Sequence, residues 1–170
     1  MPFDFIAIGD VDIDEYMHIN PTDADVVCEI NKEECKICLD YADKIVVDKF
    51  EASVAGNSAN VAIGCNKLGL STSVYSELGD DPNAEKIINY FKGQGIDTSF
   101  CKKNPNTLTD VHPIIVYKGE RTIFSYHGPK KYTLPKWEFP KWIYYTSLAY
   151  GFESFQEELV NYVKKNPEIM

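Results

Sequence analysis

The feature that most constrains the fold is an alternation of strand-like and helix-like segments along the chain. Apolar, strand-like runs at residues 3–9 and 72–77 alternate with runs of helical spacing that begin at Asn57 and Asp81. An order of this kind is typical of α/β proteins, in which helices cover a mostly parallel sheet. The sequence therefore predicts an α/β fold with a mostly parallel sheet flanked by helices.

Two further β-rich runs predict a small antiparallel addition. Residues 111–117 and 122–126 are joined by Lys-Gly-Glu-Arg, as in a hairpin. Residues 142–148 predict another strand and residues 154–164 a final helix. The acidic segment 21–43 has no regular pattern, and we interpret it as an insertion or a loop crossing.

The charge balance argues against two classes of partner. The 170 residues include 26 acidic and 17 basic side chains, which give a formal net charge of −9. An acidic surface repels phosphate groups, so nucleic acid and anionic membranes are not expected as partners. No apolar run approaches the roughly 18 residues of a membrane span, and the first ten residues lack the basic side chains of a signal peptide. We therefore expect a cytoplasmic protein.

The five cysteines leave two interpretations open. An odd number fits a reducing compartment better than a disulfide framework. Cys28, Cys35 and Cys38 follow the spacing C-x6-C-x2-C, which suggests zinc. A structural zinc site needs four ligands, and the other nearby candidates are His18 and Asp40. Scattered free thiols explain the same spacing without a metal.

The segment Ala-Gly-Asn-Ser-Ala-Asn at residues 55–60 is the most informative candidate for a binding site. Gly56 lets a ligand approach the backbone closely, and the following helix offers free amide donors at its start. The side chains of Asn57 and Asn60 both donate and accept hydrogen bonds, which suits a polyhydroxylated ligand. A glycine turn with a helix cap would explain the same residues structurally.

Three acids form a second candidate. Asp10, Asp12 and Asp14 directly follow the first predicted strand, where ligands of open α/β sheets bind. Alternate residues of an extended segment share a face, and carboxylates there can accept hydrogen bonds from sugar hydroxyl groups. The alternative is a solvated acidic loop.

Together these segments resemble the N-terminal part of the ribokinase-like (PfkB) carbohydrate kinases. The resemblance rests on GDVDID, on AGNSANVAIGCNKLGL and on STSVYSELGDDPNAEKIINYFKGQGIDTSF. The family has a Gly-Gly-x-x-Ala-Asn-like core, a Leu-Gly step, a Gly-Asp-Asp segment and a Gly-Ile-Asp-Thr-like segment in this order. Here Ala55-Gly56 stands in place of the paired glycines, and the resemblance runs over about residues 3–165.

The resemblance implies ATP-dependent phosphorylation of a hydroxyl group on a sugar, a sugar derivative or a nucleoside. Asp14 matches the acid that holds acceptor hydroxyl groups, and Asp12 stands where the family often has Asn. The other acceptor-binding residues that the resemblance implies are Gly56, Asn57 and Asn60 in the glycine-rich segment, and Arg121 and His127 at the hairpin that resembles the family's lid. Contacts made by the lid vary with the substrate. For His127, a capped surface histidine is the competing interpretation.

One part of the family's machinery has no counterpart in this sequence. The catalytic base of these kinases is the Asp of a Gly-Ala-Gly-Asp motif, whose amides also stabilise the migrating phosphoryl group, and the sequence lacks that motif. Because phosphoryl transfer depends on positioning and charge stabilisation, we expect no catalysis by this chain alone. The resemblance places the main sites for ATP and Mg²⁺ in a C-terminal half.

We therefore expect residues 1–170 to form the substrate-binding and lid portion of a ribokinase-like domain, incomplete at its C-terminus. The lid elements are expected at about residues 11–54 and 108–127, and a homodimer could form through the β lid. The acceptor is not specified. The alternative is a naturally short, non-catalytic protein that binds a polyol or a partner chain.

Overall fold

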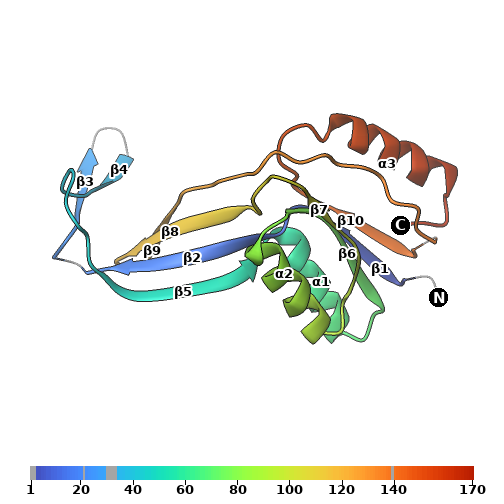
Figure 1. Cartoon of the computed structure of the whole chain (residues 1–170), viewed down its shortest axis with the longest axis horizontal. Helices are drawn as coiled ribbons and strands as arrows, with labels where there is room; N and C mark the ends of the chain where they lie inside the picture. Colours follow the sequence, from blue (N-terminus) through green and yellow to red (C-terminus); the bar gives the residue numbers. More distant parts are fainter. Residues whose placement is uncertain (1–2, 21, 30–33, 139) are drawn as a thin grey trace. The chain divides into compact units, whose positions relative to one another are not determined.

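The chain divides into two compact units. The computed structural model describes residues 3–20, 22–29, 34–138 and 140–170 (Figure 1). Unit 1 comprises Met1–Ile13, Val54–Val111 and Tyr126–Met170, and unit 2 comprises Asp14–Ser53 and His112–Ser125.

Unit 1 is built on a four-stranded sheet with the order β10-β1-β6-β7. Its strands are β1 (Phe5–Ile8), β6 (Thr72–Gly79), β7 (Asp97–Asn104) and β10 (Trp142–Tyr145). Every neighbouring pair is parallel. Its helices are α1 (Asn57–Lys67), α2 (Pro82–Gly93) and α3 (Glu153–Lys165). The prediction of an α/β fold with a mostly parallel sheet flanked by helices is confirmed.

Alternation along the strands separates two cores. Ala7 and Val74 pack with α1 and α2 residues such as Phe91, whereas Ile8 and Tyr75 pack with residues of α3. Figure 1 shows α1 and α2 on one side of the sheet and α3 on the other. Because both faces are covered, the central strands are buried on both sides, as parallel sheets require.

The start of α1 depends on a glycine at one position. Gly56 has φ +106°, and a Cβ there would lie 2.5 Å from the carbonyl oxygen of Asp10. Both the backbone conformation and the close approach exclude a side chain. The first turn of α1 is thereby held directly against the segment that follows β1.

The start of α2 follows a different rule. The side chain of Asp81 caps the helix by accepting a hydrogen bond from the amide of Ala84 at 3.0 Å, and Pro82 follows directly. Asp81 also accepts a hydrogen bond from the amide of Thr109 at 2.9 Å. A capping Asp before a first-turn Pro is a sequence signal for a helix start, as predicted.

Unit 2 holds most of a second sheet, with the order β5-β2-β8-β9. The strands are β2 (Asp12–Ile19), β5 (Val47–Ala55), β8 (Val111–Tyr117) and β9 (Glu120–Ile123). The antiparallel pair β8–β9 confirms the predicted hairpin, and its turn residues Lys118 and Gly119 both have positive φ. Such a pair matches the twist of hairpin strands. Buried residues on this sheet include Ile19, Ile115 and Tyr117.

The structure corrects the prediction of a loop at residues 21–43. Described residues of that segment form an antiparallel hairpin of β3 (Asp25–Glu29) and β4 (Glu34–Cys38). Cys28 and Cys35 are opposite each other in its register and form a disulfide, whereas Cys38 is an exposed thiol. The expectation of wholly free thiols is therefore wrong here, and two of the cysteines considered for zinc bind each other instead.

No helix among the described residues is long and apolar enough to cross a membrane.

We predict that Phe91→Ala destabilises the protein by about 3–5 kcal/mol, because the side chain is fully buried against the sheet and its removal leaves a cavity. The neighbouring Tyr90→Ala is the control, since Tyr90 is 39% exposed on the same helix, and should cost about 0.5 kcal/mol or less. Urea unfolding followed by circular dichroism measures both. Equal losses would contradict the packing of α2 described here.

Candidate functional site

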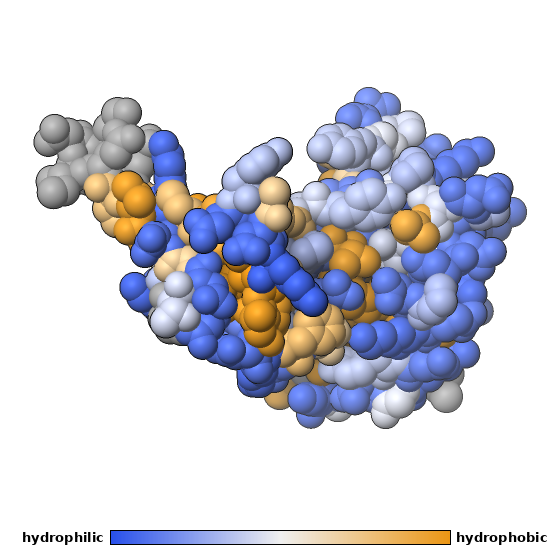
Figure 2. All heavy atoms as spheres, turned by 60° about the vertical axis from the view of Figure 1, so that its left-hand side comes forward, coloured by the Kyte–Doolittle hydropathy of each residue, from blue (hydrophilic) through white to orange (hydrophobic). Residues whose placement is uncertain are grey.

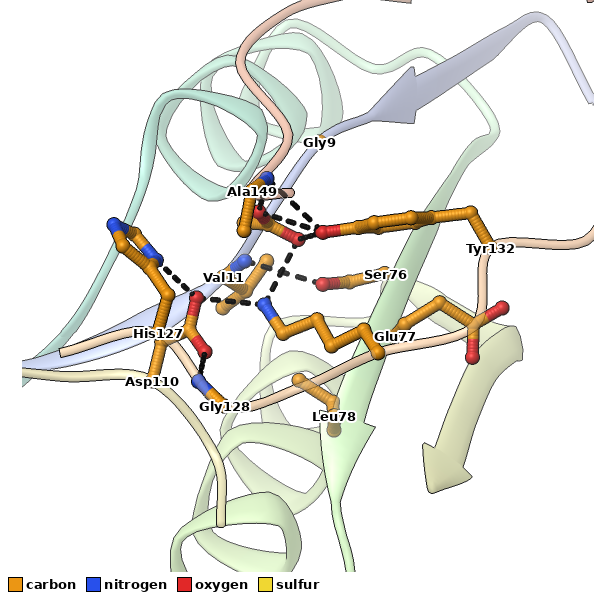
Figure 3. A network of polar contacts seen from close by, with 12 residues as sticks. Gly9, Val11, Ser76, Glu77, Leu78, Asp110, His127, Gly128, Tyr132 and Ala149 are labelled. Carbon is orange, nitrogen blue, oxygen red and sulfur yellow. Dashed lines mark hydrogen bonds and ion pairs between the residues drawn. The ribbon is translucent and has the colours of Figure 1, made fainter. Parts of the chain in front are cut away.

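The carboxyl ends of β1, β6 and β10 carry a buried polar network (Figure 3). Asp10 follows β1, and its amide donates to the carbonyl oxygen of Ser147, beyond the end of β10, at 3.1 Å. The next amide, that of Val11, donates to Ser76 Oγ of β6 at 3.1 Å. Three parallel strands are thus joined at the sheet edge where ligands of open α/β sheets bind.

The centre of the network is an ion cluster around Lys130. Its ammonium Nζ lies 2.9 Å from Asp10 Oδ1 and 2.6 Å from Asp110 Oδ2. The Lys130 side chain is 1% exposed and that of Asp110 is fully buried. Ions so far from water are tolerated only when they are paired and hydrogen-bonded, and both carboxylates meet that condition.

Asp110 also holds the segment that returns from unit 2. His127 Nδ1 lies 2.7 Å from Asp110 Oδ2, and the amide of Gly128 donates to Asp110 Oδ1 at 3.1 Å. Figure 3 shows both residues directed at this carboxylate. His127 is therefore held by a buried acid rather than lying loose on the surface.

Asp10 is held from the opposite side by Tyr132. The phenol oxygen of Tyr132 lies 3.0 Å from each carboxylate oxygen of Asp10, and the amide of Ala149 donates to Oδ2. Burial, followed by the nearby charge of Asp10, raises the pKa of Tyr132 above its usual range. The phenol therefore stays protonated and remains a donor to the carboxylate.

The geometry of this cluster disfavours a metal ion. Ligand atoms of Asp10, Asp110 and His127 lie within 4.8 Å of one another, which is the spacing of a metal site. The ammonium of Lys130, however, contacts both carboxylates. It already supplies the positive charge that a cation would bring, and it would repel that cation.

Besides His127, four of the predicted acceptor-binding residues lie in unit 1, and two of them contact segments of this network. Gly56 contacts the backbone of Asp10, and the exposed amide of Asn57 is 3.4 Å from the hydroxyl groups of Thr146 and Ser147. Asn60 is exposed on the first turn of α1, and Asp12 is buried at the start of β2. The structure therefore brings Gly56 and Asn57 to the edge at which β1 and β10 end.

The other predicted residues belong to unit 2. Asp14 lies on β2, where Tyr16 donates a hydrogen bond to its Oδ2 at 3.0 Å and His112 Nδ1 lies 3.4 Å from its Oδ1. Arg121, on β9, is exposed and lines a hollow of about 870 Å³ in the same unit, together with Tyr16 and Glu51. The convergence of Asp14 with Asn60 of unit 1 remains a prediction.

Sequence reasoning missed the residues that organise the site. Asp10 was among the candidate acids, but nothing near Lys130, Asp110 or Tyr132 in the sequence indicates a shared cluster. Lys130 and Asp10 are 120 positions apart, so no local pattern could have paired them. The one available signal was chemical: a carboxylate placed directly after a buried strand needs a partner.

The two-sided parallel sheet, the small antiparallel sheet and the helix that starts at a glycine beside β1 define a ribokinase-like α/β protein. The profile of the pfkB family carbohydrate kinases matches residues 24–150. The chain therefore belongs to the pfkB family of carbohydrate kinases.

Three relatives illustrate the extent of the similarity. The 5-dehydro-2-deoxygluconokinase of Clostridium perfringens is 30% identical over 104 residues, which is 61% of this chain and 25% of that enzyme. The structure of ribokinase from Cryptococcus neoformans var. grubii serotype A in complex with ADP gives a TM-score of 0.71 at 19% identity, covering 98% of this chain and 47% of that one. Arabidopsis thaliana ribokinase complexed with ribose and ATP gives 0.59 at 18% identity, covering 75% and 37%. The chain thus spans less than half the length of each.

We predict that Lys130→Met destabilises unit 1 by about 3–5 kcal/mol, because it leaves two buried carboxylates without their cation. Lys131→Met is the matched control: that side chain is exposed, and its loss should cost about 0.5 kcal/mol or less. Adding Asp110→Asn to Lys130→Met should recover part of the loss by removing one uncompensated charge. Urea unfolding measures all three variants, and wild-type stability of Lys130→Met would contradict the cluster.

Proposed function

We propose that this chain supplies the acceptor-binding part of an ATP-dependent kinase that phosphorylates a hydroxyl group of a sugar, a sugar derivative or a nucleoside. The observation that supports this most directly is the contact between Gly56 and the backbone of Asp10. It sets the amide-rich start of α1 beside the end of β1, which is the position expected for a ligand site in an open α/β sheet. Membership of the carbohydrate kinase family supplies the reaction class.

In this proposal two carboxylates accept hydrogen bonds from the acceptor. Asp14 is half-buried and Asp12 is buried, so a neutral polyol that reaches them replaces water with directed, charge-assisted hydrogen bonds. Asn57 and Asn60 are exposed at the start of α1 and can both donate and accept. Arg121 lines the hollow in unit 2, and its guanidinium group can donate hydrogen bonds to a hydroxyl or acidic group there.

Phosphoryl transfer needs groups beyond these. ATP would donate the phosphoryl group with Mg²⁺ neutralising its charge, and a base would receive the proton of the acceptor hydroxyl. The sequence has no Gly-Ala-Gly-Asp motif to supply that base and the accompanying amides. We therefore propose that this chain binds acceptors without turning over ATP by itself.

Titration calorimetry with D-ribose and with 5-dehydro-2-deoxygluconate tests the acceptor site. Asp14→Asn and Asn60→Ala should each weaken binding about tenfold or more, because each removes a hydrogen-bonding partner. Asp48→Asn on β5 and Asn89→Ala on α2 are matched controls, exposed and outside the proposed site, and should bind as the wild type does. ADP release should remain at background.

Three outcomes would contradict this proposal. Binding of neither compound, or equal binding by the Asp14 and Asn60 variants, would remove the acceptor site. Acceptor-dependent ADP release by the chain alone would show that it contains a complete active site. Binding without release in a naturally short protein would instead favour the non-catalytic, polyol-binding alternative.

We also propose that unit 2 pairs with a second copy through β9. This strand ends its sheet, all of its residues are exposed, and Ile123 and the adjacent Phe124 are 49% and 55% exposed. Figure 2 shows apolar surface, in orange, among hydrophilic side chains. An unprotected edge of this kind favours pairing with another strand.

Sedimentation analysis tests the pairing. The wild type should sediment as a dimer, and Ile123→Lys should give a monomer, because a charge on an edge strand opposes strand addition. Val160→Lys on α3 is the control, since Val160 is 44% exposed in unit 1, and it should leave the dimer intact. A monomeric wild type would contradict the pairing.

A further inference from the structure

A chain of polar contacts in unit 2 leads from the proposed acceptor-binding acid to a serine. Tyr16 and Asp14 come from β2, His112 from β8, and Ser125 lies just beyond β9. Tyr16 donates to Asp14 Oδ2 at 3.0 Å, His112 Nδ1 lies 3.4 Å from Asp14 Oδ1, and His112 Nε2 lies 3.1 Å from Ser125 Oγ. The proposed acceptor site does not include His112 or Ser125.

The contacts restrain the Asp14 carboxylate on both of its oxygen atoms. One oxygen accepts the phenol hydrogen of Tyr16, and the other faces the imidazole. The side chains of Asp14 and His112 are each 17% exposed, so little water competes with these contacts. Each carboxylate oxygen can still accept a second donor, such as an acceptor hydroxyl group.

The imidazole is restrained in turn. A neutral imidazole donates from one ring nitrogen and accepts at the other. When Nδ1 carries the proton that faces Asp14, Nε2 is the acceptor, and the Ser125 hydroxyl must donate to it. The carboxylate, which can only accept, selects the ring form with the proton on Nδ1, and the serine stabilises this form by donating to Nε2.

We propose that His112 is a positioning residue for Asp14, with Tyr16 and Ser125 completing the restraint. This inference rests on the proposed role of Asp14 in acceptor binding. A carboxylate held in one rotamer loses less conformational freedom when it binds an acceptor, which raises affinity. His112 thereby acts through Asp14 and needs no contact with the acceptor itself.

The ring form of each histidine gives a test that requires no ligand. Long-range 1H–15N correlation spectra of the 15N-labelled chain, recorded above the ordinary titration range of imidazole, distinguish the two neutral forms. His112 should carry its proton on Nδ1, and Ser125→Ala should shift it toward a mixture. His18 is an internal control with the opposite expectation, because its Nε2 faces Glu51 at 3.4 Å. A proton on Nε2 of His112, or no response to Ser125→Ala, would overturn the proposal.

Acceptor affinity gives the second readout. His112→Phe should weaken binding of the sugar probes used above about fivefold, since it removes one hydrogen-bonding restraint, whereas His112→Gln keeps an amide donor and should recover most of it. Equal binding by His112→Phe and the wild type would overturn the positioning role. Covalent labelling of Ser125 by a fluorophosphonate would also do so, because it would make the serine a nucleophile.

The two measurements separate the two proposals. If the wild type binds neither sugar, the proposed function fails, whereas the spectra still decide whether His112 and Ser125 restrain Asp14. If the sugars bind and the spectra show the other ring form, the positioning role fails and the acceptor site stands.

Discussion

The pairing of Lys130 with Asp10 and Asp110 is the constraint on which the carboxyl-terminal edge of the unit 1 sheet depends. Each carboxylate is buried, so neither segment could lie where it does without a cation and additional donors. One ammonium satisfies both at once. It joins the end of β1 to the segment before β8 and to the return segment that carries Lys130 itself.

The start of α1 packs against the same segment that carries Asp10. The hydroxyl of Ser58 donates to the carbonyl oxygens of Gly9 and Asp10, and Gly56 approaches the same backbone too closely to carry a side chain. The start of α1 therefore contacts the segment that contains Asp10, whose carboxylate is bound by Lys130 and Tyr132. Loosening the ion cluster would move the amide donors on which the proposed acceptor site relies.

Local sequence signals predicted the elements whose ends are set by residues adjacent in sequence. Asp81 before Pro82 marked the start of α2, and Lys118-Gly119 allowed the turn between β8 and β9. The hairpin β3–β4 was missed because its segment is acidic and without clear alternation. It is supported by contacts remote in sequence, since Ile37 packs against the cluster that contains Ile115 and Tyr117. The candidate site was predicted only in part, because Gly56 and Asn57 belong to a local motif, whereas Lys130 does not.

The sequence by itself determined the α/β class, the family and the residue types offered at the start of α1. These follow from periodicity and short motifs, which act within a few turns of chain. Only the tertiary structure decided which charges meet. Lys130 contacts Asp10 and Asp110 because folding brings distant strand ends together. His112 contacts Asp14 and Ser125 because they lie on or next to neighbouring strands. The energy of a buried charge depends on the groups that surround it in the folded structure, and these groups are not its neighbours in the sequence.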